Sequence, residues 1–196
     1  MRPLFSVLFA FALLMLGAGC APKPVDQFIG KTPALSLEEF FEGETVAYGI
    51  FEDRFGQLKR QFRVRINGRV EGNVLTLDED FLYDDGEKAN RVWTITNLGE
   101  TEEGLTRYQG QAADINGQAS GVVAGHALNW SYDIDLVTDD GTYTVHFDDW
   151  IYQQDEHIAL NRAYVTKFGF DVGSVTLVFL RGKAAAAVLP VDLTTW

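Results

Sequence analysis

The chain has 196 residues, enough for one domain with a substantial core once a leader is removed and too few for a second full domain. Hydrophobic residues make up 46% and charged residues 22%, a balance that excludes a disordered chain. The net charge of -12 argues against nucleic-acid binding, because an acidic body repels phosphate, and it equally argues that any membrane attachment needs an anchor.

Residues 1–19 have the pattern of an export leader. Arg2 gives a positive start, and residues 4–16 form an apolar run interrupted by Ser6 before the small residues that precede Cys20. As a helix this run would reach roughly 20 Å, short of the ~30 Å core of a membrane, so a spanning anchor is not expected. Residues 1–19 are therefore predicted to be a lipoprotein signal peptide.

Cys20 is the chain's single cysteine. The residues before it resemble the lipobox of bacterial lipoproteins, in which the cysteine receives lipid and acyl chains such as palmitate, although Gly17 stands where an aliphatic residue is usual. Lipidation also explains a lone thiol in an exported chain, and a plain secretory leader with a free thiol is the alternative. Ala21 resembles the residue that follows the cysteine in lipoproteins sorted to the outer membrane. We therefore expect an anchor in that membrane, facing the periplasm.

Residues 20–34 include three prolines among small and polar residues, which predicts a flexible tether. A short helix over residues 37–42 is predicted next. Ser36 and Glu39 form the pattern of a capping box, and Leu35 with Phe40 forms that of a hydrophobic staple.

From residue 45 onward, apolar and polar residues alternate with the period of half-buried strands. The clearest run extends from Leu128 to Leu136. Turn signals at Asn67-Gly68, Asn116-Gly117 and two Asp-Asp-Gly sequences separate the strands. Ten strands are predicted, over residues 45–52, 58–67, 70–82, 90–98, 104–113, 117–124, 126–137, 141–153, 157–167 and 172–181.

Tight hairpins without a helix long enough for a crossover predict an antiparallel meander. Such a sheet leaves adhesive edges unless it closes. The fold class is therefore all-β: an up-and-down, lipocalin-like barrel or curved clamshell of about ten strands with one short N-terminal helix, over residues 35–183. A membrane-spanning barrel is the weaker alternative, since it requires an apolar outer band with aromatic girdles. The alanine-rich tail, residues 184–196, is expected to pack loosely or to be disordered.

Several phrases resemble a family of small Gram-negative lipoproteins that is catalogued only as a domain of unknown function. They are FFEG at 40–43, GIFEDRFG at 49–56, FDDWIY at 147–152 and NRAYVTKFG at 161–169. The resemblance covers about residues 28–181, in the family's order. It implies a lipocalin-like fold and an envelope location, and it brings no established substrate or catalytic residue.

His146 and Asp148 share one face of a predicted strand and form, with Arg162, a possible polar site. Zinc requires three or four ligands, and the other histidines have no known ligand spacing, so no metal is expected. The more conservative reading is that the cluster makes structural hydrogen bonds between strands.

A glycosidase would need two carboxylates that converge across a cleft. Asp148 and Asp149 are adjacent on a strand and face opposite sides, so a partner would have to be Glu79 or Asp80. No nucleophile elbow and no phosphate-binding loop is present. The chain is therefore not expected to be an enzyme, and neither a cofactor nor a catalytic residue is predicted.

Aromatic and small residues give the remaining indication of function. Trp93, Trp130, Tyr132 and Trp150, with Gly121, are predicted to line an apolar cavity that accepts an acyl chain, although each could equally fill the core. The first hypothesis is thus a lipoprotein that binds a hydrophobic or lipid-like molecule. The alternatives are a structural lipoprotein that docks an envelope partner, whose identity is unknown, and an enzyme that acts on lipid or sugar.

Overall fold

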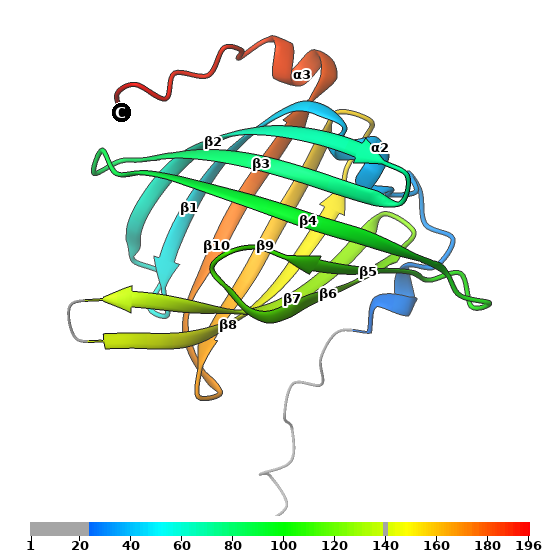
Figure 1. Ribbon diagram of the computed structural model, residues 1–196, viewed down its shortest axis with the longest axis horizontal. Helices are drawn as coiled ribbons and strands as arrows, with labels where there is room; N and C mark the ends of the chain where they lie inside the picture. Colours follow the sequence, from blue (N-terminus) through cyan, green and yellow to red (C-terminus); the bar gives the residue numbers. More distant parts are fainter. Residues whose placement is uncertain (1–23, 139–140) are drawn as a thin grey trace, which may run out of the picture.

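The computed structural model describes residues 24–138 and 141–196, so the predicted signal peptide, Cys20 and the start of the tether lie outside the described residues. Ten antiparallel strands follow one another around a closed barrel, and the first strand pairs with the last (Figure 1). The predicted all-β barrel is confirmed. The strands are β1 (Gly43–Asp53), β2 (Leu58–Glu71), β3 (Val74–Tyr83), β4 (Lys88–Glu100), β5 (Thr106–Gln111), β6 (Ile115–Ala124), β7 (Ala127–Thr138), β8 (Gly141–Gln153), β9 (Ile158–Lys167) and β10 (Phe170–Arg181).

The predicted short helix is α2 (Leu37–Phe41), which packs at one end of the barrel (Figure 1). The Ser36 hydroxyl accepts a hydrogen bond from the Glu39 backbone N–H at 3.2 Å, as a capping residue does. The same hydroxyl donates to the Glu38 carboxylate, so Glu38 is the acidic partner of the cap in place of the expected Glu39. Phe41 is buried, and its ring meets that of Phe179 on β10 edge to face. This helix of five residues is therefore held in place by the barrel's core.

The Ser36→Ala variant should lower the free energy of unfolding by about 1 kcal/mol, because the Glu39 N–H loses its partner at the start of α2. Urea unfolding followed by circular dichroism measures this loss. Ser36→Thr keeps the hydroxyl and is expected to restore most of the stability. Equal losses in both variants would contradict a capping role.

Two predicted hairpin turns are wrong because the Asn-Gly pairs lie inside strands. Gly68 pairs with Gly43 and Leu77, and β2 continues to Glu71. A Cβ atom at Gly68 would overlap the Phe41 carbonyl oxygen, so this glycine is needed for the close approach of α2. Gly117 lies in β6 at an irregular register and has a positive φ of 78°. It marks a bulge in the strand.

The described part of the predicted tether, residues 24–34, lies against the outer wall of the barrel. It contains a 3-10 helix, η2 (Val25–Phe28), and the Phe28 ring contacts the rings of His126, Trp150 and Tyr152. A Cβ at Gly125 would overlap the Phe28 carbonyl oxygen. This segment packs on the strands and is not the flexible tether that we expected. The Phe28 ring contacts the strands, and the absence of a side chain at Gly125 allows the backbone of the segment to approach closely.

The alanine-rich tail also packs on the outside. After β10 the chain forms α3 (Gly182–Ala186), and Ala185 and Val191 are buried against Val46 of β1. Arg63 of β2 donates to the Asp192 carbonyl oxygen at 3.1 Å. The tail is thus a packed strap and not the loose appendage that its composition predicts. None of the helices in the described residues is long and apolar enough to cross a membrane.

Candidate functional site

The barrel encloses a cavity of about 480 Å³, within the range of small-molecule sites. Leu37 and Phe41 of α2 face it from one end. Toward the other end lie Tyr83 and Arg60, whose guanidinium stacks 3.6 Å from the centre of the Tyr83 ring. Most of the wall is aromatic or aliphatic, and it includes Phe51, Phe62, Val64, Ile66, Leu77, Phe81, Trp93, Ile95, Leu128, Trp130, Tyr132, Ile134, Phe147, Ile151, Val175, Leu177 and Phe179.

Trp93, Trp130 and Tyr132, which we expected at a cavity, lie on this wall. Gly121 does not provide open space, since a Cβ there would overlap the Trp130 ring. Its missing side chain makes room for that tryptophan. Trp150 lies on the outer face of β8, where Phe28 and Tyr152 pack against it. It is buried by the N-terminal segment and does not line the cavity.

A polar cluster interrupts the apolar wall. Glu79, Arg91, Tyr132 and Asp149 lie on the wall itself, and Asp114 binds Arg91 from outside the cavity lining. Glu79 on β3 and Arg91 on β4 are cross-strand partners. Arg91 donates from Nε and Nη2 to one Asp114 oxygen in the β5–β6 turn, at 3.0 and 2.6 Å. The Tyr132 hydroxyl on β7 donates to Asp149 Oδ2 on β8 at 3.2 Å. We call these five residues the interior polar cluster.

Burial controls the ionisation of this cluster. It raises the pKa of Glu79 to about 7 and that of Asp149 to about 7, because a carboxylate loses its hydration there. The positive charge of Arg91 opposes both shifts, and the Tyr132 hydrogen bond opposes that of Asp149. Burial alone would lower the pKa of Arg91, but its acidic neighbours outweigh that effect and raise it. The cavity thus holds two carboxyl groups that gain or lose a proton near neutral pH and an arginine that stays charged.

The Tyr132→Phe variant tests the hydrogen bond to Asp149. Its loss should raise the Asp149 pKa further above its ordinary range and destabilise the barrel by about 1–2 kcal/mol, since a buried carboxyl oxygen loses its donor. A carbon-13 NMR titration of the Asp149 carboxyl measures the shift. Tyr143→Phe, near the barrel rim, is the matched control and should leave that titration unchanged. An unchanged pKa in Tyr132→Phe would show that this bond does not stabilise the ionised form.

The residues of the predicted polar site all lie on the outer surface. His146 Nδ1 is 2.8 Å from Asp133 Oδ1. Asp148 accepts hydrogen bonds from Asn129 and from the Trp150 indole. Arg162 donates to Thr176 Oγ1 on β10 at 2.6 Å and lies 3.6 Å from a Glu52 oxygen. Each side chain thus bonds to a neighbouring strand, and no hydrogen bond or ion pair joins any two of the three. No group of acidic, histidine or cysteine side chains in residues 24–138 and 141–196 is arranged to hold a metal.

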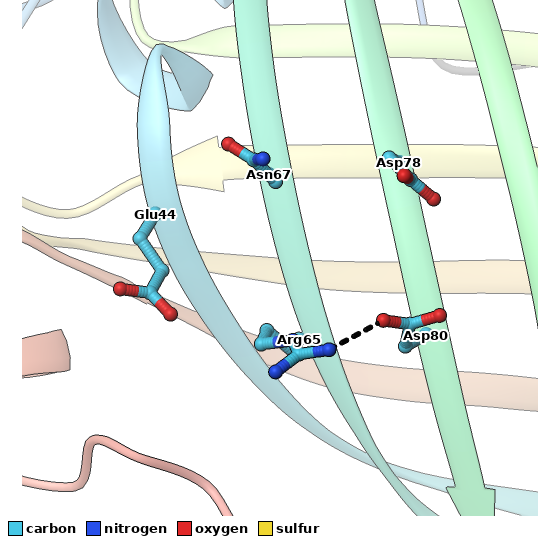
Figure 2. A pocket seen from close by; sticks show the side chains of 5 residues that line it. All are labelled: Glu44, Arg65, Asn67, Asp78 and Asp80. Atoms are coloured by element: carbon cyan, nitrogen blue, oxygen red, sulfur yellow. Dashed lines mark hydrogen bonds and ion pairs between the residues drawn. The ribbon is translucent and has the colours of Figure 1, made fainter.

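A second hollow, of about 370 Å³, lies on the outer surface of β1, β2 and β3 and is polar. Figure 2 shows Arg65 on β2 reaching toward Asp80 on β3, and their closest atoms are 2.8 Å apart. Asn90 donates to Asp78 and Asp80 at 2.8 and 3.0 Å. The polar groups therefore bind one another across the strands, which is the usual arrangement of a solvated sheet face.

Fold and cavity together define a closed, lipocalin-like β-barrel with an internal site. The chain belongs to the family described as "Protein of unknown function (DUF3833)", whose model matches residues 13–181. Comparison with curated proteins found no match.

Among solved structures, the chain is similar to an S-type phycobiliprotein lyase from Guillardia theta. The TM-score is 0.53 at 12% identity, over 76% of this chain and 94% of that one. At this identity the likeness shows the fold alone. A shared fold does not determine an activity, so the expectation that the chain is not an enzyme stays a prediction.

Proposed function

We propose that this protein is an envelope lipoprotein whose barrel binds a hydrophobic or lipid-like small molecule. The cavity carries this proposal, because an aromatic and aliphatic wall around about 480 Å³ favours an apolar occupant. Burying a ligand there gains about 0.8 kcal/mol for each CH₂ group removed from water.

Uptake of 1-aminoanthracene, a small fluorophore that brightens in apolar surroundings, tests the binding function. Val175 lines the cavity, so Val175→Trp should fill it and weaken uptake at least tenfold. Leu160 is on the outer face and 43% exposed, so Leu160→Trp adds the same ring without affecting uptake. Mass spectrometry of gently extracted protein should show a bound small molecule. Absence of saturable uptake by the unmodified chain would overturn the proposal.

The anchor is the second part of the proposal. Support for it comes from the leader and from Cys20, which precedes Pro24, the first described residue, by four positions. Four residues span at most about 14 Å, so a lipid on Cys20 would hold the η2 side of the barrel close to the membrane. Intact-mass measurement of membrane-extracted protein should reveal acyl chains on a chain that begins at Cys20. Cys20→Ala should release the protein from the membrane fraction, and retention there would contradict the proposal.

Acid–base chemistry on a bound molecule is a second candidate function, and the two cavity carboxyl groups with pKa values of about 7 favour it. Turnover of lipid or sugar esters by the purified chain would reveal such an activity. Asp149→Asn should abolish it, whereas Asp148→Asn changes the neighbouring carboxyl on the outer face and should not. Activity that survives in Asp149→Asn would exclude a role for this group.

A further inference from the structure

The charges of the interior polar cluster do not balance. Arg91 is its one basic member, and Asp114 occupies Nε and Nη2 of the guanidinium. Within the described residues, neither Glu79 nor Asp149 has an arginine, lysine or histidine nitrogen within 4.0 Å. Glu79 and Asp149 are therefore left on the cavity wall without an ion pair.

The two carboxyl groups also have unused hydrogen-bonding capacity. Asp149 Oδ1 is buried and has no hydrogen-bond partner in the described part of the chain. Glu79 makes no hydrogen bond there, although its side chain is on the cavity wall. An ionised carboxylate accepts hydrogen bonds and cannot donate them. A bound molecule would satisfy these groups by donating.

An anionic head group would be repelled by these carboxyl groups. It would lie beside two acidic groups in surroundings of low polarity, where repulsion between like charges is several times stronger than in water. Arg60 is the other arginine on the wall, and its Nη2 is bound by Asp85 and Glu87 at 2.8 and 2.6 Å. Its Nε is buried and has no hydrogen-bond partner among the described residues. Both arginines on the cavity wall are thus already paired with carboxylates.

We propose that the molecule held in the barrel is an amphiphile with an apolar body and a hydrogen-bond-donating or cationic end, such as an ammonium or hydroxyl group, and that Glu79 and Asp149 bind this end. The inference rests on the proposed binding function and names the ligand class for the same cavity. Free fatty acids and phosphate-bearing lipids are the disfavoured classes.

Probes that share one chain and differ in the head group test this selectivity. Dodecylamine, dodecanol and dodecanoate should compete for 1-aminoanthracene bound to the full chain in phosphatidylcholine nanodiscs at pH 8. We expect dodecylamine to bind at least about tenfold more tightly than dodecanoate, a difference of about 1.4 kcal/mol. Partition of each probe into the nanodisc is the same for all variants, so comparison between variants isolates the cavity.

The Glu79→Gln/Asp149→Asn double variant should reduce the preference for dodecylamine to less than about threefold while it still takes up 1-aminoanthracene. Asp78→Asn is the matched control, because it removes one charge from β3 on the outer face and should keep the full preference. Equal binding of the three probes, or a preference that survives in the double variant, would overturn the head-group assignment alone. If 1-aminoanthracene itself is not taken up, the binding function fails as well.

Discussion

At pH 8 the Glu79→Gln and Asp149→Asn variants are each expected to be more stable than the unmodified chain by on the order of 3 kcal/mol. Burial raises the pKa of Glu79 from an ordinary 4.5 to about 7 and that of Asp149 from 3.8 to about 7. Each pKa unit corresponds to about 1.4 kcal/mol of stability at a pH above both values. A neutral amide removes this cost of ionising a buried carboxyl group.

The sign of the effect follows from proton binding. Between about pH 4 and pH 7 the folded chain holds protons on these carboxyl groups that the unfolded chain has released. The contribution of these two groups to the stability of the unmodified protein should therefore be greatest below about pH 4. It should fall between pH 4 and pH 7 and stay constant above pH 7. The advantage of each variant should vanish at pH 4. The gains should not add fully in the double variant, because the two acids raise each other's energy.

Urea unfolding at pH 4, 6 and 8 measures this dependence. Asp78→Asn provides the control, since its side chain is solvated on the outer face and accepts a hydrogen bond from Asn90. This control should keep most of the pH dependence of the unmodified chain, because Asp78 is the smallest of the contributions that raise the pKa of Glu79. A Glu79→Gln profile with the same pH dependence as the unmodified chain would mean that Glu79 is ionised in the folded state at little cost.

The Trp130→Ala variant is expected to lose about 3–5 kcal/mol of stability, the usual cost of removing a large buried aromatic side chain. Trp130 is 6% exposed, and its ring meets that of Trp93 edge to face with centroids 5.6 Å apart. Its other surface lies against Gly110 and Gly121, where a Cβ atom would overlap the indole. The two glycines and the tryptophan thus form one packing unit.

A double-mutant cycle tests whether Gly121 serves Trp130. Gly121→Val alone should destabilise the barrel by about 1–3 kcal/mol because the new side chain displaces the indole. In the Trp130→Ala background the same substitution should cost much less, since it enters space that the ring has left. Urea midpoints of the four proteins give the coupling energy. Additive losses would show that the glycine is needed for another reason, such as strand geometry.

Much of the fold could be predicted because a strand with one buried face alternates with period two. From Leu128 to Leu136 the inward side chains are apolar and the outward ones polar, so strand and face are evident from the sequence. Closure of the barrel could be inferred only from the need to protect the unpaired edges of the sheet. The two incorrect turns have one physical cause: glycine next to asparagine marks unusual backbone or close approach as readily as it marks a hairpin.

Two members of the interior polar cluster, Glu79 and Asp149, could have been predicted from the same alternation of inward and outward residues. Val145, Phe147 and Ile151 share one face of β8, and Asp149 belongs to that face by position. Glu79 lies likewise between Leu77 and Phe81 on β3. Such charged residues on an apolar face were the signal for the site.

The surroundings of Trp150 could not be predicted in this way. By position on β8 it faces outward, and an outward tryptophan is exposed unless another segment covers it. The covering residue is Phe28, from a segment whose prolines and polar residues indicate a flexible linker. Contacts between segments more than a hundred residues apart leave no local pattern in the sequence.

Closure of the barrel by β1 and β10 has a consequence for how the chain acquires its structure. The paired residues run from Thr45 with Arg181 to Asp53 with Gly173, so the ring is sealed between segments about 130 residues apart. Contacts of such long range are slow to form, because a large loop must be ordered before they stabilise anything. β1 is synthesised first and must wait with an unpaired edge until nearly the last residues of the barrel arrive. The nascent chain therefore depends on being kept from aggregating until β10 has been synthesised.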